Sequence, residues 1–429
     1  MIRKIIVVSA LFVSIVSFAQ INNTSAYSFF GIGDKNNQTT VEQLSMGGVG
    51  VSFHDSFHLN FLNPAAIASI KSTNYSLALE NVNINAKDNV NNQKGSYTYL
   101  SYLAVGFPLS NKAGFVFGLL PNSSVGYSLI TTVEDTDGNV TEASYYKGNG
   151  GTNKAFVNFG YKPFKGFSVG LQGNYIFGNI DNSVINQKKD VALSAKYQTV
   201  SNIKGYAFSV GMIYDKKLSE KVDMHLGANF ELENNINTKG NEYFYSLLYS
   251  SGSVESPRDT ILNVESNGTI KSPLKTNLGV GFGKEGKWYA GLDYSFQKAL
   301  NVEGDVLGNY SKIAYDKYNK IAIGGFYIPK FNSISNYWER VTYRAGIKFE
   351  NTGLMVDALG NGTDYTPIND FGISFGVGLP MNKQLSNLNL GFEVGKRGKT
   401  TNGLVQENYF KFRVSLSLND KWFKKRQIF

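Results

Sequence analysis

The chain has 429 residues, no cysteine and a formal net charge of +9 at pH 7. The absence of cysteine excludes disulfide bonds, thiolate metal sites and a cysteine nucleophile. The positive charge is spread through predicted turns and loops, apart from one run near the C-terminus. We therefore expect no nucleic-acid partner, which would require basic residues clustered on one element.

Residues 1–19 have the pattern of a secretory signal peptide. Arg3 and Lys4 precede an apolar run at 5–18, and Ala19 offers a small residue for cleavage. The run is shorter than the roughly 17 to 25 residues of a membrane-spanning helix, which disfavours a retained anchor. We therefore predict export and removal of this segment.

The rest of the chain is rich in aromatic residues and glycine but has no apolar stretch as long as a transmembrane helix. The whole sequence contains 30 Phe, 26 Tyr and 45 Gly, with a mean hydropathy of -0.20. These features are typical of an all-β transmembrane barrel, because each of its strands is apolar on one face only. A soluble β-sandwich is the alternative, but a chain of this length would then form two or more domains.

Residues 20–72 differ in texture from the alternating segments after residue 72 and are too long for an idle tail, so we predict an N-terminal plug segment, which we call the hatch. Their glycine-rich stretch includes Gly47 and Gly48, where missing side chains permit close backbone approach to an inner wall. Pro64 restricts Asn63 to extended conformations, which also suits a threaded plug. In the alternative, this segment only leads the chain into the first strand.

Within the hatch, His54 and His58 have a spacing that would place two imidazoles on one face of a helix, as a metal site requires. No third ligand and no helical pattern accompany them, so we predict no metal and no cofactor. The remaining histidine, His225, is expected to be a hydrogen-bonded lumen residue. No G-x-S-x-G element or spaced carboxylate pair is present, so we expect no enzyme activity.

Residues 73–419 are predicted to form the barrel, because apolar and polar side chains alternate along many segments. At 410–418, for example, apolar side chains alternate with Lys411, Arg413 and two serines. A period of two places these groups on opposite faces of a strand, one toward lipid and one toward the lumen. About fourteen antiparallel strands result, an even number as in bacterial outer-membrane barrels. They lie at 73–84, 96–107, 112–120, 152–162, 167–180, 204–215, 221–234, 274–284, 287–297, 317–328, 340–350, 368–379, 386–396 and 405–418.

Short and long connections alternate between these strands. The connection at 163–166 is short, for instance, whereas the one at 121–151 is long and polar. Bacterial outer-membrane barrels have short periplasmic turns and long external loops, so we place both mature termini in the periplasm. In the loop at 121–151 we expect an extra hairpin, made of 124–133 and 141–148, that projects without crossing the membrane.

Several ionisable side chains fall on the predicted inner face of the late strands. They form either a charged patch that holds a ligand headgroup or the hatch, or, as we prefer, the ordinary pairing of a polar interior. These lumen residues are Arg344, Lys348, Glu350, Glu393, Lys411 and Arg413.

Residues 41–70 resemble the start of the FadL/OmpP1 family of outer-membrane transport proteins. The similarity rests on a glycine-rich segment at 46–53 (MGGVGVSF), followed by Asn63, Pro64 and Ala65 just before the first strand. The resemblance implies a fourteen-stranded barrel in the bacterial outer membrane with an N-terminal hatch in its lumen. It also implies passive uptake of long-chain fatty acids or other hydrophobic molecules.

The first functional hypothesis rests on this resemblance. A hydrophobic small-molecule ligand would pass along the hatch of a barrel surrounded by membrane lipids. The residues expected on the hatch and ligand path are Phe29, Phe30, Gly47, Gly48, Asn63, Pro64 and Ala65. Uptake also needs a gap in the wall, for which we consider Gly324 and Gly325 as candidates.

The second hypothesis is a plugged, non-transporting barrel that serves as a subunit of an outer-membrane protein assembly or secretion complex. Residues 27–34 depart from the fatty-acid transporters and look more like barrels of this superfamily that serve multiprotein machines. The charged inner face and a basic periplasmic tail at 420–429 also favour it. The tail would contact a periplasmic protein partner or acidic headgroups; alternatively it is only an anchor at the membrane interface.

Overall fold

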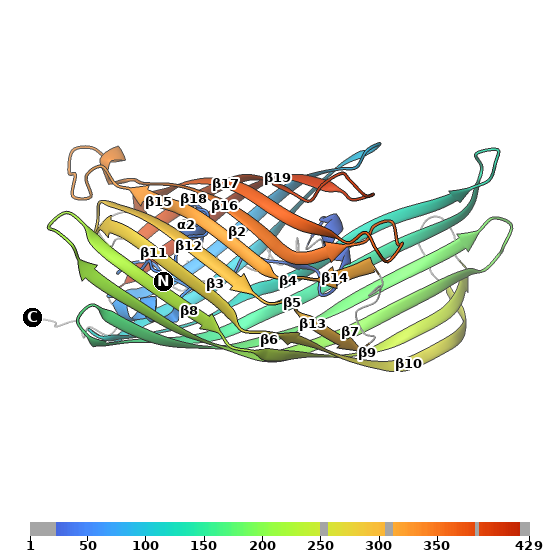
Figure 1. Cartoon of the computed structure of the whole chain (residues 1–429), viewed down its shortest axis with the longest axis horizontal. Coiled ribbons are helices and arrows are strands. Elements are labelled where there is room, and N and C mark those ends of the chain that lie inside the picture. Colours follow the sequence, from blue (N-terminus) through green and yellow to red (C-terminus); the bar gives the residue numbers. More distant parts are fainter. Residues whose placement is uncertain (1–22, 249–255, 305–311, 382–385, 421–429) are drawn as a thin grey trace, which may run out of the picture.

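The computed structural model describes residues 23–248, 256–304, 312–381 and 386–420. These residues form one antiparallel sheet that closes on itself as a barrel around the N-terminal segment (Figure 1). Closure occurs where β19 (Gln406–Asp420) pairs with β2 (Thr73–Lys87), from Gln406 opposite Lys87 to Asp420 opposite Thr73. The predicted signal peptide and the residues of the basic tail beyond Asp420 lie outside the described residues.

The wall is a closed barrel of 14 strands, four of which are divided into two segments. The remaining segments are β3 (Asn92–Ser110), β4 (Ala113–Glu134), β5 (Val140–Phe164), β6 (Phe167–Lys188), β7 (Ser194–Lys217), β8 (Asp223–Glu231), β9 (Asn234–Leu248), β10 (Ser256–Ser272), β11 (Lys275–Lys284), β12 (Trp288–Gln297), β13 (Asn301–Gly304), β14 (Ile313–Tyr315), β15 (Tyr318–Tyr327), β16 (Thr342–Val356), β17 (Thr366–Met381) and β18 (Ser386–Arg397). The predicted fold class is therefore confirmed.

The short helical elements lie inside the barrel or beside it. They are η1 (Ala26–Phe29), α2 (Val41–Leu44), η2 (Pro64–Ser69) and η4 (Trp338–Arg340). No helix among the described residues is long and apolar enough to cross a membrane.

The prediction of long polar loops was wrong for one part of the wall, where most of those residues continue the strands. The segments 124–133 and 141–148, which we expected to form a separate hairpin, are the far ends of β4 and β5. These two strands are paired with each other from Ala113 opposite Tyr161 to Glu134 opposite Val140. β5 has 25 residues and β7 has 24, whereas a membrane-spanning strand needs about 9 to 11. Polar composition misled the prediction, because a strand outside the membrane need not be apolar on either face.

The four divided strands are neighbours, and their interruptions fall at one level. The gaps are at 232–233, 273–274, 298–300 and 316–317. They adjoin one another because Lys275 is paired with both Glu231 and Gln297. A line of kinks therefore crosses this part of the wall, and such irregularities bend a strand.

Gly324 and Gly325, which we considered for a wall opening, are not at this line. They belong to the uninterrupted ladder between β12 and β15, where they face Gly291 and Ala290. The same two glycines are also paired regularly with β16. The regular pairing on both sides therefore contradicts the expected wall opening at Gly324 and Gly325.

The hatch enters the described structure at Asn23 and runs along the inside of the wall. The two-residue strand β1 (Asp34–Lys35) pairs with Ser124 and Ser123 of β4. The helix α2 begins with a capping box, in which Thr40 and Gln43 satisfy each other's backbone N–H groups. Farther on, η2 packs against β4, β5, β6 and β7. Figure 1 shows this segment enclosed by the strands.

A ring of wall glycines faces the hatch, and we call it the glycine ring. At each member an added Cβ would lie within 2.9 Å of a hatch atom. Real Cβ atoms essentially never approach so closely, so hatch and wall are in direct contact. The ring consists of Gly114, Gly160, Gly170, Gly211, Gly227, Gly279, Gly291, Gly324, Gly346, Gly376 and Gly391.

Because the glycine ring touches the hatch, one methyl group added to a ring glycine should disturb the packing of the hatch against the wall. At Gly170 an added Cβ would meet the backbone of Pro64 and Ala65 at less than 3.0 Å, whereas at Gly173 on the same strand the nearest atom is 3.6 Å away. We expect Gly170→Ala to lower the free energy of unfolding by about 1–3 kcal/mol, because overpacking forces the backbone to shift.

Gly173→Ala is the matched control and should change that free energy by less than about 0.5 kcal/mol. Thermal unfolding of both variants in detergent, followed by the mobility shift of the folded barrel on gels, would measure the difference. Equal stability of the two variants would contradict direct backbone contact.

Candidate functional site: the plugged lumen and its chamber

Asn63 joins the hatch to the barrel wall. It is fully buried, and its Oδ1 accepts a hydrogen bond of 3.0 Å from the Ala65 N–H, which caps η2. Its Nδ2 donates to the carbonyl oxygens of Val51 at 2.7 Å and Met212 at 3.1 Å. Pro64 occupies the first position of η2, where its missing N–H costs nothing. One asparagine therefore connects two hatch segments with β7.

Gly47 and Gly48 end the helical turn of α2 at the place where the hatch crosses β16. Their φ angles are +72° and +86°, a left-handed conformation that L side chains rarely adopt. At Gly47 an added Cβ would also lie 2.6 Å from the carbonyl oxygen of Ile347. These two glycines are therefore required by backbone geometry and by the contact with the wall.

The carboxylate of Glu42 on α2 is buried against the polar face of the late strands. Its Oε1 accepts hydrogen bonds from Asn389 at 2.8 Å and from Ser417 at 2.9 Å. Arg344 donates to the same Asn389 side chain at 3.0 Å. The predicted lumen residue Arg344 thus reaches the hatch through one intervening amide.

A buried ion-pair network fills the lumen beside α2. Arg413, which is 0 % exposed, pairs with Glu80 at 2.9 Å and with Glu393 at 2.6 Å. Lys348 pairs with Glu393 at 3.0 Å and with Asp370 at 3.4 Å. Charges withdrawn from water need such partners, because an unpaired buried ion is strongly destabilising.

Of the other predicted lumen charges, Glu350 is half-buried on the inner face of β16. Lys411 faces Glu393 in the register of β18 and β19, and its ammonium group lies 4.6 Å from the centre of the Tyr409 ring. All six predicted residues therefore lie on late strands and along one side of the lumen. Glu80 was not singled out in the sequence, although the alternation along 73–84 places it on the inner face.

A second network holds the start of the hatch, and sequence reasoning missed it. Arg397 pairs with Asp34 at 2.7 Å and with Glu407 at 2.6 Å. Glu407 also accepts hydrogen bonds of 2.8 Å from the Ser25 hydroxyl and the Ala26 N–H. The alternation that marked Lys411 and Arg413 as inward-facing also applies to Glu407, two periods earlier on the same strand, and could have revealed it.

Phe29 and Phe30 fill the lumen beyond these charges. The Phe29 ring packs edge-on against Phe30 at 5.1 Å and Tyr127 at 4.9 Å between ring centres. Phe30 also packs on a cluster that contains Tyr27 and Ile368. These contacts place both rings in aromatic packing between hatch and wall.

On the other side of the hatch lies a chamber of about 1450 Å³, at the end of the barrel that carries the short turns. It is lined by turn residues such as Gly166 and Gly286 together with His54, Asp55 and His58 of the hatch. His54 and His58 do not converge: His58 pairs with Asp55 at 2.8 Å, and His54 contacts Asp215 of β7 at 2.9 Å.

The ion pair within the hatch shifts the protonation of both partners. Burial raises the pKa of the Asp55 carboxyl, but the neighbouring His58 imidazole and the Phe57 N–H outweigh burial and hold that pKa below its usual value. Burial lowers the pKa of the His58 imidazole, but the Asp55 carboxylate outweighs burial and raises it above its usual value. The pair therefore favours its charged form inside the chamber.

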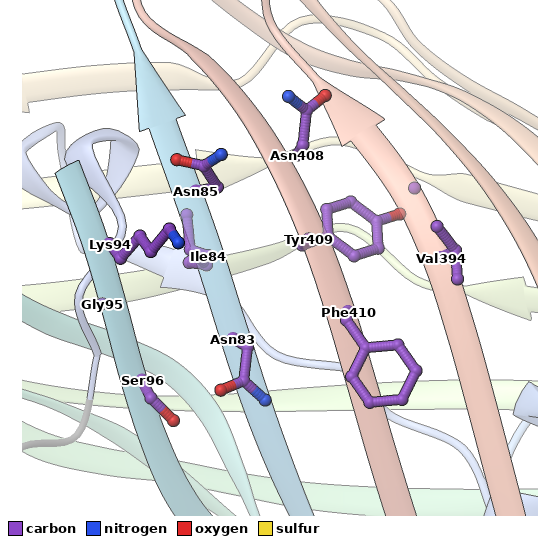
Figure 2. Close-up of a pocket in the computed structure, with 11 residues that line it drawn as sticks. Asn83, Ile84, Asn85, Lys94, Gly95, Ser96, Val394, Asn408, Tyr409 and Phe410 are labelled. Carbon is purple, nitrogen blue, oxygen red and sulfur yellow. The ribbon is translucent and has the colours of Figure 1, made fainter. Parts of the chain in front are cut away.

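A smaller hollow of about 590 Å³ lies between β2, β3, β18 and β19, on the outer face of the wall (Figure 2). Its polar side chains are Asn83, Asn85, Lys94, Ser96 and Asn408, and Phe410 lies at one side. Tyr409 points to the lumen from the same strand and is buried. The hollow is a depression of the wall and does not reach the hatch.

Two substitutions on β19 test the buried ion-pair network. We expect Arg413→Met to lower the free energy of unfolding by about 3–5 kcal/mol, because it leaves Glu80 buried without its cation and Glu393 with Lys348 alone. Lys411→Met is the matched control on the same inner face, and it should cost less than about 1 kcal/mol, as a partly exposed charge does. Unfolding of both variants in denaturant, monitored by tryptophan fluorescence, gives the comparison; equal losses would contradict the buried network.

The fold is that of known outer-membrane channels. The Pseudomonas putida toluene transporter TodX superimposes with a TM-score of 0.60 at 15% identity, covering 91% of this chain and 100% of that chain. The Ralstonia pickettii toluene transporter TbuX superimposes with a TM-score of 0.58 at 13% identity, covering 89% of this chain and 98% of that chain. A Pseudomonas aeruginosa FadL homologue superimposes with a TM-score of 0.57 at 13% identity, covering 91% of this chain and 99% of that chain. The implied FadL-type fold is confirmed by these structures, whose low identity shows the fold alone.

Two sequence comparisons address the family. The search of the curated proteins found no match. The family model described as BamG matches residues 1–428, nearly the full length of the sequence. The start of the chain resembles FadL/OmpP1 proteins, but the match over its whole length decides the assignment. The chain belongs to the BamG family.

Proposed function

We propose that this protein is a plugged barrel of the bacterial outer membrane that serves as a subunit of an outer-membrane protein assembly or secretion complex. The observation that carries this proposal is the way the hatch is held. The glycine ring brings hatch and wall backbones into contact. The ion pair between Asp34 of the hatch and Arg397 of the wall, and the hydrogen bond from Asn63 to the Met212 carbonyl, hold them together. Passage straight through the lumen would require these contacts to break, whereas a structural subunit would keep them.

The long strands supply a surface for protein partners. β4 to β7 are each longer than a membrane requires by about a dozen residues. This surplus extends roughly 40 Å along the strand. Their far ends carry exposed apolar side chains on both faces of the sheet, such as Ile130 on one face and Val133 on the other, each 58 % exposed. Exposed apolar groups beyond the membrane-spanning part of a barrel mark a candidate interaction site.

Membership in the BamG family, and not in a family named for FadL, agrees with this function. The predicted signal peptide and the barrel fold support a location in the outer membrane. The placement of both termini in the periplasm is supported by the end of β19, since Asp420 pairs with Thr73 at the edge that carries the short turns. The role of the basic tail stays a prediction.

A second function, passage of a hydrophobic small molecule, is favoured by one feature of the chamber. Among its lining residues are the aromatic side chains of Phe53, Phe57, Trp288, Tyr289 and Phe326. The proteins of the same fold include toluene transporters, and an aromatic chamber would suit such a ligand. The fatty-acid specificity implied by the resemblance to FadL belongs to this second proposal.

Purification from the native membrane distinguishes the two functions. We expect the tagged chain, extracted in mild detergent, to bring stoichiometric protein partners, which native mass spectrometry would weigh together with any bound small molecule. Ile130→Asn combined with Val133→Asn should reduce partner recovery while the barrel stays folded. A lone barrel with a lipid-sized adduct would favour transport and count against the subunit.

A disulfide that locks the hatch gives a second test, since the chain has no cysteine of its own. An added Cβ at Gly391 would lie 2.8 Å from the Ser45 Oγ, so Ser45→Cys with Gly391→Cys places two thiols in bonding range. We expect the oxidised variant to recover partners as well as the reduced one. Uptake of labelled oleate or toluene that stops on oxidation and returns on reduction would instead show that the hatch moves for transport.

A further inference from the structure

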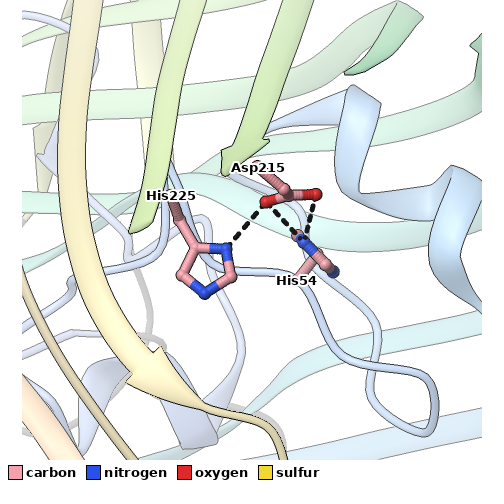
Figure 3. A group of neighbouring side chains, drawn as sticks. All are labelled: His54, Asp215 and His225. Atoms are coloured by element: carbon pink, nitrogen blue, oxygen red, sulfur yellow. Dashed lines mark hydrogen bonds and ion pairs between the residues drawn. The ribbon is translucent and has the colours of Figure 1, made fainter. Parts of the chain in front are cut away.

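Two histidines and one aspartate from separate parts of the chain converge in the chamber. His54 comes from the hatch, Asp215 from the end of β7 and His225 from β8, where it faces Asp215 in the register. His54 Nε2 lies 2.9 Å from both carboxylate oxygens, and His225 Nδ1 lies 2.7 Å from Oδ1. Figure 3 shows both rings directed at the one carboxylate.

The three side chains are accessible from the chamber, which all of them line. Their side chains are 20 %, 21 % and 19 % exposed for His54, Asp215 and His225. An ion could therefore reach them, and a water molecule in the chamber could complete its coordination. Imidazole nitrogen and carboxylate oxygen are the donors that zinc sites with an open position use.

The arrangement as it stands is a pair of hydrogen bonds, in which each imidazole presents an N–H to the carboxylate. The other nitrogens, Nδ1 of His54 and Nε2 of His225, point away from Asp215 in Figure 3. No hydrogen bond to either of them occurs among the residues that the structure describes. An imidazole ring can carry its proton on the outer nitrogen and present a lone pair inward, and a bound ion would then replace the hydrogen bond to Asp215.

The donor atoms lie close enough together to converge on one ion. All three lie within 4.8 Å of one another. A tetrahedral zinc ion with bonds of about 2.0–2.2 Å separates its ligand atoms by about 3.3 Å. The distances of 2.7–2.9 Å between the imidazole nitrogens and the carboxylate would lengthen by roughly 0.5 Å to reach this separation.

We propose that His54, Asp215 and His225 form a binding site for a divalent transition-metal ion of the zinc class, with water as a further ligand. Hard cations such as Ca²⁺ and Mg²⁺ prefer all-oxygen sites and would not be retained by two imidazoles. The ion would join His54 of the hatch to β7 and β8 of the wall and so add a bond that the other hatch contacts do not supply.

The chain provides its own control, because it contains 3 histidines and the third, His58, lies on the hatch with Asp55 as its partner. The full chain, purified through a histidine-free tag and treated with a chelator, would be titrated with Co²⁺ and Zn²⁺ in detergent. We expect one Co²⁺ per chain with visible d–d absorption, displaced by Zn²⁺, and a raised temperature of unfolding with either metal.

His54→Gln, His225→Gln and Asp215→Asn should each weaken metal affinity roughly tenfold or more, whereas His58→Gln should bind as the unmodified chain does. If His54→Gln disturbs the hatch, His225→Gln on the wall still tests the site, with circular dichroism and heat-dependent gel mobility as checks of folding.

Two results would overturn the proposal: metal binding no stronger than in the His54→Gln/His225→Gln double variant, or a loss in His58→Gln equal to that in His54→Gln. Cu²⁺ bound to the unmodified chain should show two nitrogen ligands by electron paramagnetic resonance, and one or none would also count against it. The site does not depend on the proposed subunit function, because its test uses the isolated chain and the subunit test uses native membranes.

Discussion

The backbone of the hatch lies directly against the backbone of the wall, and the rest of the interior depends on this contact. At positions such as Gly170 and Gly346 there is no room for even a Cβ atom. Close approach makes the plug part of the packed interior, so that buried hydrogen bonds such as those of Asn63 can reach strands far away in the sequence. The seated hatch then separates an aromatic and charged lumen from the chamber at the turn end.

Because the hatch fills the lumen, polar and charged side chains on the inner face of the late strands must pair with one another or with the hatch. Arg413 does so with Glu80 and Glu393, and Arg397 does so with Asp34 of the hatch. Paired buried charges contribute little net stability compared with apolar packing, but removal of one partner is costly. The Arg413 pairs join neighbouring strands of the wall, whereas the Arg397–Asp34 pair joins the wall to the hatch, which favours a permanent plug over a movable gate.

The two ends of the barrel differ in construction. At the turn end, short connections surround an open chamber in which the hatch presents His54 and His58. At the opposite end, β4 to β7 continue as paired strands instead of giving way to long loops. A paired sheet holds apolar groups such as Ile130 in fixed positions, which lowers the entropy lost when a protein partner binds. This asymmetry agrees with one end serving assembly and the other facing the periplasm.

The barrel could be predicted from the sequence because lipid on one side and a polar lumen on the other impose a period of two, which residues 410–418 display. Strand number and inward-facing charges such as Arg413 result from the same local rule. Only tertiary structure decided which distant groups meet: Glu80 with Arg413, Ser25 with Glu407, His54 with Asp215 and His225. Those contacts depend on the shear of a closed sheet and on the path of the hatch, which no local pattern encodes. The extent of β4 and β5 escaped prediction for a related reason, since beyond the membrane their hydrogen-bonded partners, and not an apolar face, keep them extended.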